Sequence, residues 1–587
     1  MSLDYRNTNS LWASVAVKTL VKLGLKTAVV CPGSRSTPLT YALAVHRDID
    51  TIPILDERSA AFFALGCAKQ QGQPVVLVCT SGTAGANFYP AVIEAYESQV
   101  PLLVMTADRP PELRDCGAGQ AIDQQKLYGD FVVAQIELAV PVASHDMLAY
   151  LRQTLVQLWL RSQHPQSGPV HLNGPFRDPL PPVPESGSLT LRLNEATFFA
   201  SVQPVTRPQA LPIGTPLEIW EKCDRGLIIA GPAQPQNPLA YCQAVARLSK
   251  WLGWPVLAEG LSPLRNYQAQ LPYLISTYNI LLRSPEQAEQ LYPSHVIQLG
   301  PLPTSKLLRQ WLAQMPHQRW VIAETQRNLD PTHGQVQQIP VSVFALAQQL
   351  PEQKRSKQKR PRQKETPNPY LNQWRQAEQR VRPALNQEMA QTDALFEGKV
   401  AWTLAQHLPE RTPVFVANSM PVRDVEAFWQ PNDRQYSICF SRGANGIDGT
   451  LSTALGMVQG GRQGVLLTGD LALLHDTNGF LSAQHLQGHL TIVLINNQGG
   501  GIFEMLPISE FEPPFEKFFA TPQKINFRPL CKAYDIEYTL INSWVEFNRA
   551  ISSLPEQGIR LLEIRTHRKL DAQRRWQIFQ RLSSSGI

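Results

Sequence analysis

The chain has 587 residues, of which 43% are hydrophobic and 17% charged, and its net charge is +6. This length predicts three or four domains rather than one core, and the composition is typical of globular proteins. No stretch offers the roughly 18 apolar residues of a membrane span, and residues 1–6 lack the apolar region of a signal peptide. We therefore expect a cytoplasmic protein without a membrane span.

The predicted first domain, 1–188, alternates short apolar strands with helical patterns, as parallel α/β domains do. Its second strand ends in the acidic pair Asp56-Glu57 and opens into a helix. Taken alone, such a pair most often caps the helix and complements its dipole. The predicted strands are 27–30, 51–55, 75–79 and 102–106.

The predicted second domain, 189–366, repeats this alternation. The sequence GPAQP at 231–235 replaces a GxGxxG turn, which argues against dinucleotide binding. The basic run at 354–364 indicates a solvated interdomain linker rather than a nucleic-acid or lipid site, because it is flanked by proline and lacks aromatic residues. The predicted strands are 226–231, 255–258, 295–300 and 320–323.

The predicted third domain, 367–587, begins with a helical stretch, followed by a strand at 414–417 and a segment at 449–456. Then come a strand at 465–468, a helix at 477–487 and a strand at 490–495. This unit places Asp470 and Asn497 at neighbouring carboxyl ends of a parallel sheet, where ligands usually bind. Their hard oxygen atoms suit a Mg²⁺ ion shared with a diphosphate, although an ordinary turn and a polar loop remain the alternative.

The eight cysteines are scattered and form no CxxC pair. Most lie in apolar contexts, which favours buried thiols over disulfides or a zinc site.

The Gly469-Asp470 and Asn496-Asn497 pairs resemble the cofactor signature of thiamine diphosphate enzymes. The resemblance implies three Rossmann-like parallel-sheet domains. The first binds the pyrimidine of the cofactor, the second is a middle domain, and the third binds the diphosphate. It also implies thiamine diphosphate and Mg²⁺ (or Mn²⁺) as cofactors, with Asp470, Asn497 and the Gly499 carbonyl as metal ligands. Glu57 matches the catalytic carboxyl group that hydrogen-bonds the cofactor's pyrimidine and relays protons to it.

Several longer strings narrow the resemblance to the MenD family, the 2-succinyl-5-enolpyruvyl-6-hydroxy-3-cyclohexene-1-carboxylate synthases. These are CPGSRSTP at 31–38, TSGTA at 80–84, TADRPPE at 106–112, NS at 418–419, SRGANGIDG at 441–449 and GGGIF at 499–503. The resemblance implies a transferase that decarboxylates 2-oxoglutarate and adds the four-carbon acyl anion equivalent to isochorismate, in menaquinone or phylloquinone synthesis. It further implies a homodimer or homotetramer with sites at subunit interfaces and no nucleic-acid partner.

Residue by residue, the resemblance carries over two sets of binding positions. Expected at the cofactor are Glu57, Ser81, Gly82, Thr83, Ser419, Ile447, Gly469, Asp470, Leu471, Ala472, Asn497, Gly499, Ile502 and Phe503. Expected at the substrates are Ser34, Arg35, Arg109, Gln120, Lys306, Ser419, Arg423, Arg442, Phe503 and Leu506. Ile447 matches the aliphatic residue that keeps the cofactor bent, while core packing is the alternative for Ile447, Phe503 and Leu506.

Two positions depart from the family pattern. Leu307 follows Lys306 where a relative has arginine, and Arg309 is expected on another face of that helix. Ala472 stands where a hydroxyl or glycine is common, so backbone amides are expected to contact the diphosphate there.

Both implied substrates are dicarboxylates, and guanidinium groups bind carboxylates bidentately. Arg35, Arg109, Arg423 and Arg442 follow strands or lie in loops, and four converging arginines would form a polyanion site. Each has a plainer alternative: a turn cap for Arg35, simple exposure for Arg442, Asp108 or Glu112 as partner of Arg109, and Asp424 as partner of Arg423.

Three other functions remain open. The chain could be another thiamine diphosphate 2-oxoacid decarboxylase or an enzyme like acetolactate synthase. Simple decarboxylases often carry a His-His pair, which is absent here, and a flavin-binding middle domain is not evident. A noncatalytic relative is the third, but it would be expected to have lost Glu57, Asp470 or Asn497.

Overall fold

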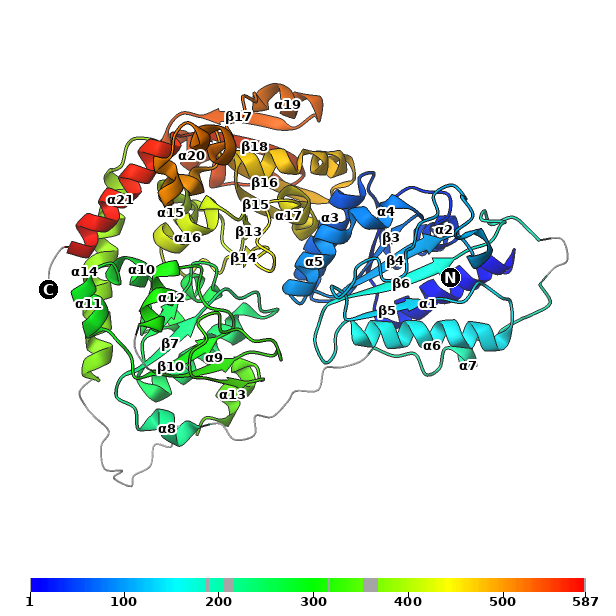
Figure 1. Cartoon of the computed structure of the whole chain (residues 1–587), viewed down its shortest axis with the longest axis horizontal. Coiled ribbons are helices and arrows are strands. Elements are labelled where there is room, and N and C mark those ends of the chain that lie inside the picture. The colour runs from blue at the N-terminus through cyan, green and yellow to red at the C-terminus, as the bar shows by residue number, and fades with distance from the viewer. Residues whose placement is uncertain (1, 186–188, 205–215, 315–316, 352–367, 585–587) are drawn as a thin grey trace.

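The computed structural model describes residues 2–185, 189–204, 216–314, 317–351 and 368–584. These residues form three parallel sheets of six strands each (Figure 1). The expected three-domain parallel α/β fold is therefore confirmed. The basic run at 354–364 and the predicted boundaries at 188 and 366 lie outside the described residues.

The first sheet has the strand order β2-β1-β3-β4-β6-β5. Two of its strands were not predicted, because β6 interrupts its apolar residues with His171, Asn173 and Gly174, and β5 is only half-buried. The strands are β1 (Thr27–Val30), β2 (Asp50–Pro53), β3 (Val75–Cys79), β4 (Leu102–Asp108), β5 (Ala134–Glu137) and β6 (Pro169–Pro175). The helices are α1 (Thr8–Leu23), α2 (Thr37–Ala44), α3 (Glu57–Gln71), α4 (Thr83–Asn87), α5 (Tyr89–Glu97), α6 (His145–Arg161) and α7 (Glu195–Phe198).

The middle sheet has the order β12-β11-β10-β7-β8-β9. The loop after β7 packs closely against the loop after β10, because a Cβ atom on Gly231 would lie 1.8 Å from the carbonyl oxygen of Pro301. The strands are β7 (Gly226–Ala230), β8 (Val256–Ala258), β9 (Leu274–Ile275), β10 (His295–Leu299), β11 (Gln318–Ile322) and β12 (Val336–Ile339). The helices are α8 (Leu217–Glu221), α9 (Pro238–Leu252), α10 (Tyr278–Leu281), α11 (Pro285–Gln290), α12 (Lys306–Ala313) and α13 (Val343–Gln349).

The third sheet has the order β14-β13-β15-β16-β18-β17. Its strands are β13 (Pro413–Val416), β14 (Ser437–Cys439), β15 (Arg462–Gly469), β16 (Gly488–Asn496), β17 (Glu537–Ile541) and β18 (Gly558–Arg565). Its helices are α14 (Pro369–Gln391), α15 (Glu397–His407), α16 (Met420–Phe428), α17 (Thr450–Val458), α18 (Asp470–His475), α19 (Phe527–Ala533), α20 (Trp544–Ile551) and α21 (Arg568–Ser584).

The helix predicted at 477–487 is wrong in type and extent. A short α18 ends before Asp476, and a 3₁₀-helix covers Thr477–His485. The buried carboxylate of Asp476 accepts hydrogen bonds from the backbone and hydroxyl of Ser452, at 2.7 and 3.0 Å. This tertiary contact divides the segment in a way that residue pattern alone does not reveal.

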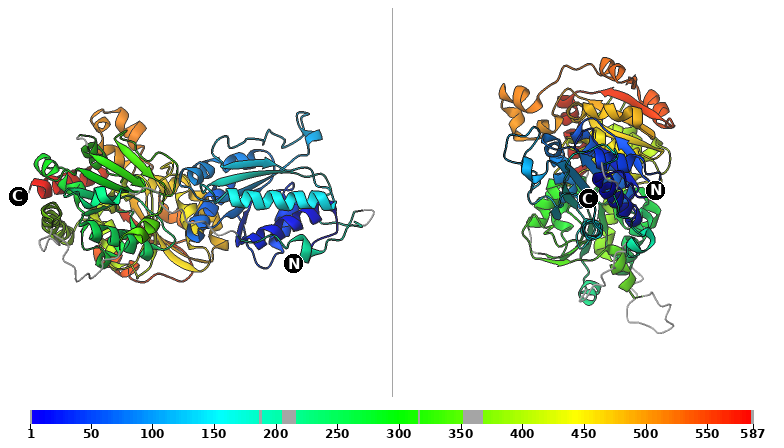
Figure 2. Two further views of the ribbon diagram at one scale, coloured as in Figure 1. Left: turned by 90° about the horizontal axis from the view of Figure 1, so that it is seen from below. Right: turned by 90° about the vertical axis from the view of Figure 1, so that its right-hand side faces the viewer.

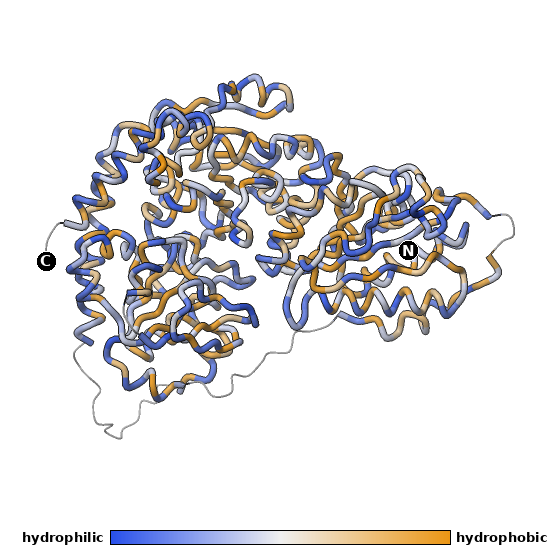
Figure 3. Tube along the Cα trace, in the orientation of Figure 1, coloured by the Kyte–Doolittle hydropathy of each residue, from blue (hydrophilic) through white to orange (hydrophobic). Residues whose placement is uncertain are grey.

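The first and third domains share one hydrophobic core. Helices α3 and α17 lie side by side between the two sheets (Figure 1), and Phe62 and Phe63 belong to the same buried cluster as Leu451 and Leu455. Hydropathy along the chain shows the apolar strands of all three domains flanked by polar connections (Figure 3).

The molecule is elongated, with the first domain at one end (Figure 2). Helices α14 and α21 run along the side of the middle and third domains that faces away from the first domain (Figure 1), and they contact each other there. Among the described residues, no helix combines the length and apolar character needed to cross a bilayer.

Candidate cofactor and substrate site

The carboxyl ends of β15 and β16 bring Asp470 and Asn497 to one edge of the third sheet. The two strands are parallel, with Gly469 opposite Ile495, so each polar residue follows its strand directly. The backbone N–H of Gly499 donates to Asp470 Oδ2 at 2.8 Å, and that of Leu471 donates to Oδ1 at 2.9 Å. Two segments 29 residues apart are thus tied together at this edge.

Two polar atoms, one at this edge and one in the first domain, lack the hydrogen-bond partners that buried polar atoms normally have. Asn497 Oδ1 and Ser81 Oγ are buried, and neither has a hydrogen-bond partner. Burial also raises the pKa of Asp470 to about 6, against hydrogen bonds from Leu471 and Gly499 that lower it. A Cβ atom on Gly469 would meet nothing within 4 Å, so space remains beside the carboxylate.

These features fit a hard cation and an anionic group. Oxygen atoms of a carboxylate, an amide and a backbone carbonyl are ligands that Mg²⁺ accepts when it shares a phosphate. Within the described ranges, no cluster of three or more His, Cys, Asp or Glu residues suits a metal ion. The ligand set expected at the Asp470–Asn497 edge is of a different kind, with only one carboxylate.

The loop after Asn497 depends on glycine. Gly499 has a φ of 134°, and a Cβ atom there would lie 2.2 Å from the carbonyl oxygen of Ala520. The N–H of Gly500 donates to that same oxygen at 2.7 Å. The loop continues into half-buried Ile502 and Phe503, whose ring meets Phe519 edge-on at 5.9 Å, and into exposed Leu506.

Glu57 is the first residue of α3, but it does not cap this helix. Asp56 does, accepting from the N–H of Ser59 at 3.1 Å. Asp56 also accepts from Asn478, and Arg58 donates to the carbonyl of His475, at 2.7 and 2.9 Å. The start of α3 therefore contacts the end of α18 and the segment just after it in the same chain, and the half-buried Glu57 is left for another role.

The turn at 81–83 lies beside another predicted site residue. Gly82 has a φ of 86°, and its N–H donates to Gln124 Oε1 at 2.8 Å. A Cβ atom on Gly82 would lie 3.4 Å from Gln120, so this turn and Gln120 are adjacent. Thr83 and Ser34 are both exposed.

The four predicted arginines fall into two groups rather than one. Arg35 and Arg109 lie in the first domain, and burial followed by the charge of Arg109 lowers the pKa of Arg35. Arg423 and Arg442 lie in the third domain, where burial followed by the charge of Arg442 lowers the pKa of Arg423. The four arginines thus neighbour one another in pairs within the described part of the chain, and the convergence of all four stays a prediction.

The carboxylates that were the alternative partners of Arg109 and Arg423 are engaged elsewhere. Asp108 pairs with Arg114 at 2.9 Å, and Glu112 pairs with Arg177 at 2.5 Å. The guanidinium of Arg109 instead donates to the carbonyl of Gly119.

In the third domain, Asp424 pairs with Arg575 at 2.6 Å. Arg423 donates to the carbonyl of Ser419, at the start of α16, where Ser419 has a φ of 70°. Arg35 donates to the carbonyl of Phe176 at 2.8 Å. Positive charge is therefore only partly compensated at these positions.

Arg309, on α12, lies near two of the predicted arginines. Its charge contributes to the lowered pKa of both Arg423 and Arg442, so it lies near them. Its guanidinium donates to the carbonyl of Pro303 at 2.7 Å. Lys306 is exposed at the start of α12, and Leu307 packs against apolar residues instead. Arg309 thus adds positive charge to this group.

The loop with Arg442 and Ile447 is held by residues of the first domain that the sequence did not single out. Glu94 on α5 accepts from the N–H groups of Gly443 and Ala444, at 3.1 and 2.7 Å. Buried Lys69 on α3 donates to the carbonyl of Phe440 at 2.6 Å. No local pattern marks this clamp, because Glu94 and Ala444 are 350 residues apart.

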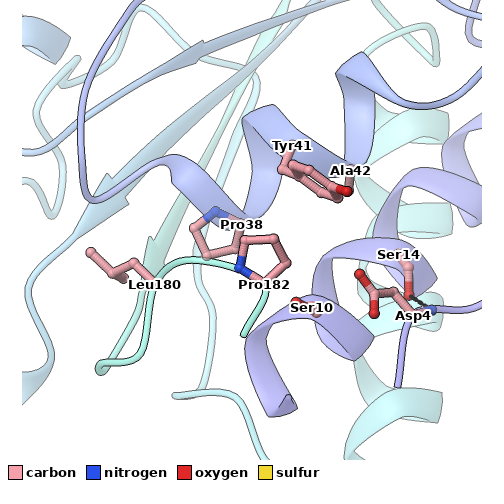
Figure 4. A pocket seen from close by; sticks show the side chains of 8 residues that line it. All are labelled: Asp4, Ser10, Ser14, Pro38, Tyr41, Ala42, Leu180 and Pro182. Atoms are coloured by element: carbon pink, nitrogen blue, oxygen red, sulfur yellow. Dashed lines mark hydrogen bonds between the residues drawn. The ribbon is translucent and has the colours of Figure 1, made fainter. Parts of the chain in front are cut away.

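Other predicted positions lie near these elements. Arg442 donates to Asn418 Oδ1 at 2.9 Å. The carbonyl of Ile447 accepts from Thr450 at 2.7 Å, and Ala472 is buried in α18. A small hollow between α1, α2 and residues 180–182, lined in part by Tyr41 and Pro182, includes none of the predicted site residues (Figure 4).

The fold and this site define the class of thiamine pyrophosphate enzymes, and three domain families match in the same order. The N-terminal TPP binding domain matches residues 12–127, the middle domain 194–416 and the C-terminal TPP binding domain 422–564. Two solved structures share the fold at 17% identity and cover 95% of this chain and 99% of theirs. They are a putative thiamin diphosphate-dependent enzyme from Mycobacterium smegmatis, with a TM-score of 0.66, and a 4-hydroxybenzoylformate decarboxylase from Rhodococcus jostii, with 0.68.

Curated relatives narrow the class further. A 2-succinyl-5-enolpyruvyl-6-hydroxy-3-cyclohexene-1-carboxylate synthase from Acaryochloris marina is 56% identical and covers 96% of both chains. One of the same name from Nostoc sp. is also 56% identical and covers 98% of this chain and 97% of its own. The chain therefore belongs to the family of 2-succinyl-5-enolpyruvyl-6-hydroxy-3-cyclohexene-1-carboxylate synthases.

Proposed function

We propose that this chain catalyses the synthase reaction of its family. It decarboxylates 2-oxoglutarate with thiamine diphosphate and adds the resulting four-carbon unit to isochorismate, within menaquinone or phylloquinone synthesis. The observation that carries this proposal is identity above one half, over nearly the full length, to relatives named for this activity. Glu57, Asp470 and Asn497 are all present, which argues against a noncatalytic relative.

For the metal, Asp470, Asn497 and the carbonyl of Gly499 would hold Mg²⁺ or Mn²⁺. The unpartnered Oδ1 of Asn497 supports this assignment, because a buried oxygen without a hydrogen-bond donor can bind a cation instead. Ser81 and the open space beside Gly469 are suited to the cofactor itself. When bound, thiamine diphosphate supplies the electron sink for decarboxylation.

Glu57 would hold a proton at the pyrimidine ring of the cofactor. This role fits its position at the start of α3, where Asp56 provides the helix cap and leaves the Glu57 carboxyl group uncommitted. Ile447 would contact the cofactor from the loop that Glu94 holds.

The arginines would orient the carboxylates of the two substrates. Arg35 and Arg109 form one positive group, and Arg423 and Arg442 with Arg309 form another. Two separate arginine groups could each bind one of the two dicarboxylate substrates. Alternatively, the group of one chain could complete a site with the group of a second chain. Ser34, Gln120, Lys306, Ser419, Phe503 and Leu506 remain predicted neighbours of substrate.

We further infer a homodimer or homotetramer with sites at subunit interfaces. The separation of the two arginine groups within one chain supports this inference. The eight cysteines are all free, which suits the reducing cytoplasm. The proposed domain limits are 1–188, 189–366 and 367–587.

The decisive test is an assay with 2-oxoglutarate, isochorismate, thiamine diphosphate and Mg²⁺ that follows loss of isochorismate. We expect consumption of isochorismate that depends on all three other components. Release of CO₂ without loss of isochorismate would instead indicate a decarboxylase, and formation of acetolactate from pyruvate would indicate an enzyme like acetolactate synthase.

A further inference from the structure

A buried carboxylate lies directly behind Asn497. Nδ2 of Asn497 donates to Glu397 Oε1 at 2.6 Å, and both side chains are buried. The other oxygen of Glu397 accepts from Arg575 Nη2 at 3.1 Å. A carboxylate paired with a guanidinium can only accept hydrogen bonds, so the nitrogen of the Asn497 amide must face Glu397. The amide oxygen therefore points away from Glu397, and this is the oxygen that lacks a partner.

Arg575 ties this arrangement to two other helices. It lies on α21, near the end of the chain, and also donates to Asp424 Oδ1 on α16 at 2.6 Å. Glu397 is the first residue of α15. All three side chains are at most 3% exposed, so water offers them no alternative partners. The guanidinium of Arg575 thus holds the Glu397 carboxylate in place, and that carboxylate in turn orients the Asn497 amide.

We propose that Glu397 is a positioning residue that turns the Asn497 oxygen toward the bound cation, and that Arg575 holds Glu397 in place. This inference rests on the proposed metal site, since it requires a cation at Asp470, Asn497 and Gly499. Glu397 acts through Asn497 and does not itself bind the cation. Groups that orient metal ligands in this way commonly affect metal affinity by about 10- to 100-fold.

The substitution Glu397→Gln separates positioning from mere packing, because the shape of the side chain is conserved while one acceptor becomes a donor. If the oxygen of the introduced glutamine stays on Arg575, its N–H₂ group faces Asn497 and turns the Asn497 oxygen away from the cation. If the glutamine amide is rotated the other way, its N–H₂ group faces the guanidinium of Arg575, so two hydrogen-bond donors face each other. Either arrangement opposes the orientation that the cation needs.

The first experiment measures Mn²⁺ binding to the full chain with thiamine diphosphate, by electron paramagnetic resonance, which does not depend on turnover. For Glu397→Gln we expect Mn²⁺ affinity to fall by about tenfold or more. The matched control is Glu388→Gln on α14, which removes a surface ion pair to Arg581 on the same helix α21. The control should bind Mn²⁺ normally, and unchanged affinity in a folded Glu397→Gln protein overturns the proposal.

The second experiment adds Asn497→Asp, alone and with Glu397→Gln. Alone, it places two carboxylates against each other and should weaken Mn²⁺ binding. In the double variant, the introduced glutamine can donate to the introduced aspartate and accept from Arg575, so every hydrogen bond is satisfied again. We expect the double variant to bind Mn²⁺ at least about tenfold more tightly than Asn497→Asp alone.

A packing role for Glu397 predicts additive losses, so a double variant no better than Asn497→Asp overturns the proposal even if Glu397→Gln alone does not fold. The native protein serves as the reference for the metal site itself. If it binds no Mn²⁺ in the presence of thiamine diphosphate, the proposed metal site fails. If it binds Mn²⁺ and the variants do not differ, only the positioning role fails.

Discussion

Individual ion pairs decide which arginines remain available for a substrate. Asp108, Glu112 and Asp424 stand next to Arg109 or Arg423 in sequence or a few residues away, yet the fold pairs them with Arg114, Arg177 and Arg575. An arginine whose neighbouring carboxylate is already neutralised keeps its charge for a carboxylate that arrives from solution. The plainer alternatives for Arg109 and Arg423 are thereby weakened.

Replacing Arg423 with alanine should weaken substrate binding while the holoenzyme still forms. Hydrogen bonds to charged groups contribute about 1.5–3 kcal/mol, so we expect KM to rise by roughly ten- to a hundredfold. Steady-state kinetics and a thiamine diphosphate titration check the two parts. Arg549→Ala, on the exposed side of α20, is the control and should change neither quantity. Loss of cofactor binding in Arg423→Ala would indicate a structural role instead.

Glu57→Gln should remove turnover and leave cofactor binding largely intact. Acid–base groups of this kind typically contribute about 10²- to 10⁴-fold to rate, and the carboxamide cannot exchange the proton. Turnover and thiamine diphosphate affinity are measured side by side. Asp56→Asn is the matched control, because asparagine also caps helices well and should preserve activity. Normal turnover in Glu57→Gln would exclude the proton relay.

Asp470→Ala should weaken Mg²⁺ and thiamine diphosphate binding together. The carboxylate is the one charged group of the proposed ligand set, and it also accepts from the N–H groups of Leu471 and Gly499. Calorimetric titration of each ligand in the presence of the other tests this coupling. Equal affinities in the variant and the native protein would contradict the metal site.

At the scale of elements, the contact between α3 and α17 joins the first and third domains. The helices approach so closely that a Cβ atom on Gly456 would lie 2.0 Å from the carbonyl oxygen of Phe63. On the opposite helix, a Cβ atom on Gly66 would lie 2.1 Å from that of Thr453. Neither backbone oxygen can move without shifting its helix, so the domain contact depends on these two glycines.

Gly456→Ala should therefore destabilise the chain. Overpacking of this kind costs about 1–3 kcal/mol of the free energy of unfolding. Denaturant unfolding of the apoprotein measures this cost. Gly174→Ala on β6 is the control, because its nearest atom would lie at 3.5 Å, an ordinary contact. A Gly456→Ala protein as stable as this control would show that the helices can separate freely.

At the scale of the whole molecule, the positions of Glu57 and of the two arginine groups raise the question whether one site is formed by one chain or by two. If Glu57 of one chain serves the Asp470 edge of its partner, two inactive variants can complement each other. A mixed dimer of Glu57→Gln and Asp470→Ala chains then carries both substitutions in one site and none in the other.

Refolding equal amounts of the two variants together should thus restore about one quarter of native activity, since half of the dimers are mixed and half of their sites are intact. Light scattering coupled to gel filtration provides the accompanying mass, which should be that of two or four chains. If activity stays at the level of the separate variants in a confirmed mixed oligomer, each site is built within one chain.

The sequence determined the three-domain parallel fold and the placement of Asp470 and Asn497 at the same edge of the third sheet. Apolar strands in a parallel sheet carry the residues after them to one edge, so this placement follows from chain order alone. The strand after which Glu57 lies was predicted for the same reason. Strands with polar interruptions, such as β6, were not predicted because their apolar pattern is weak.

Only the tertiary structure decided which charges neutralise each other and how the Asn497 side chain is oriented. Glu397 and Asn497 are 100 residues apart, and Arg575 reaches Glu397 and Asp424 across 178 and 151 residues. Such contacts depend on how α15, α16 and α21 pack together, which no local spacing encodes. The sequence thus determined the residues available for chemistry, whereas helix packing determined their partners and orientation.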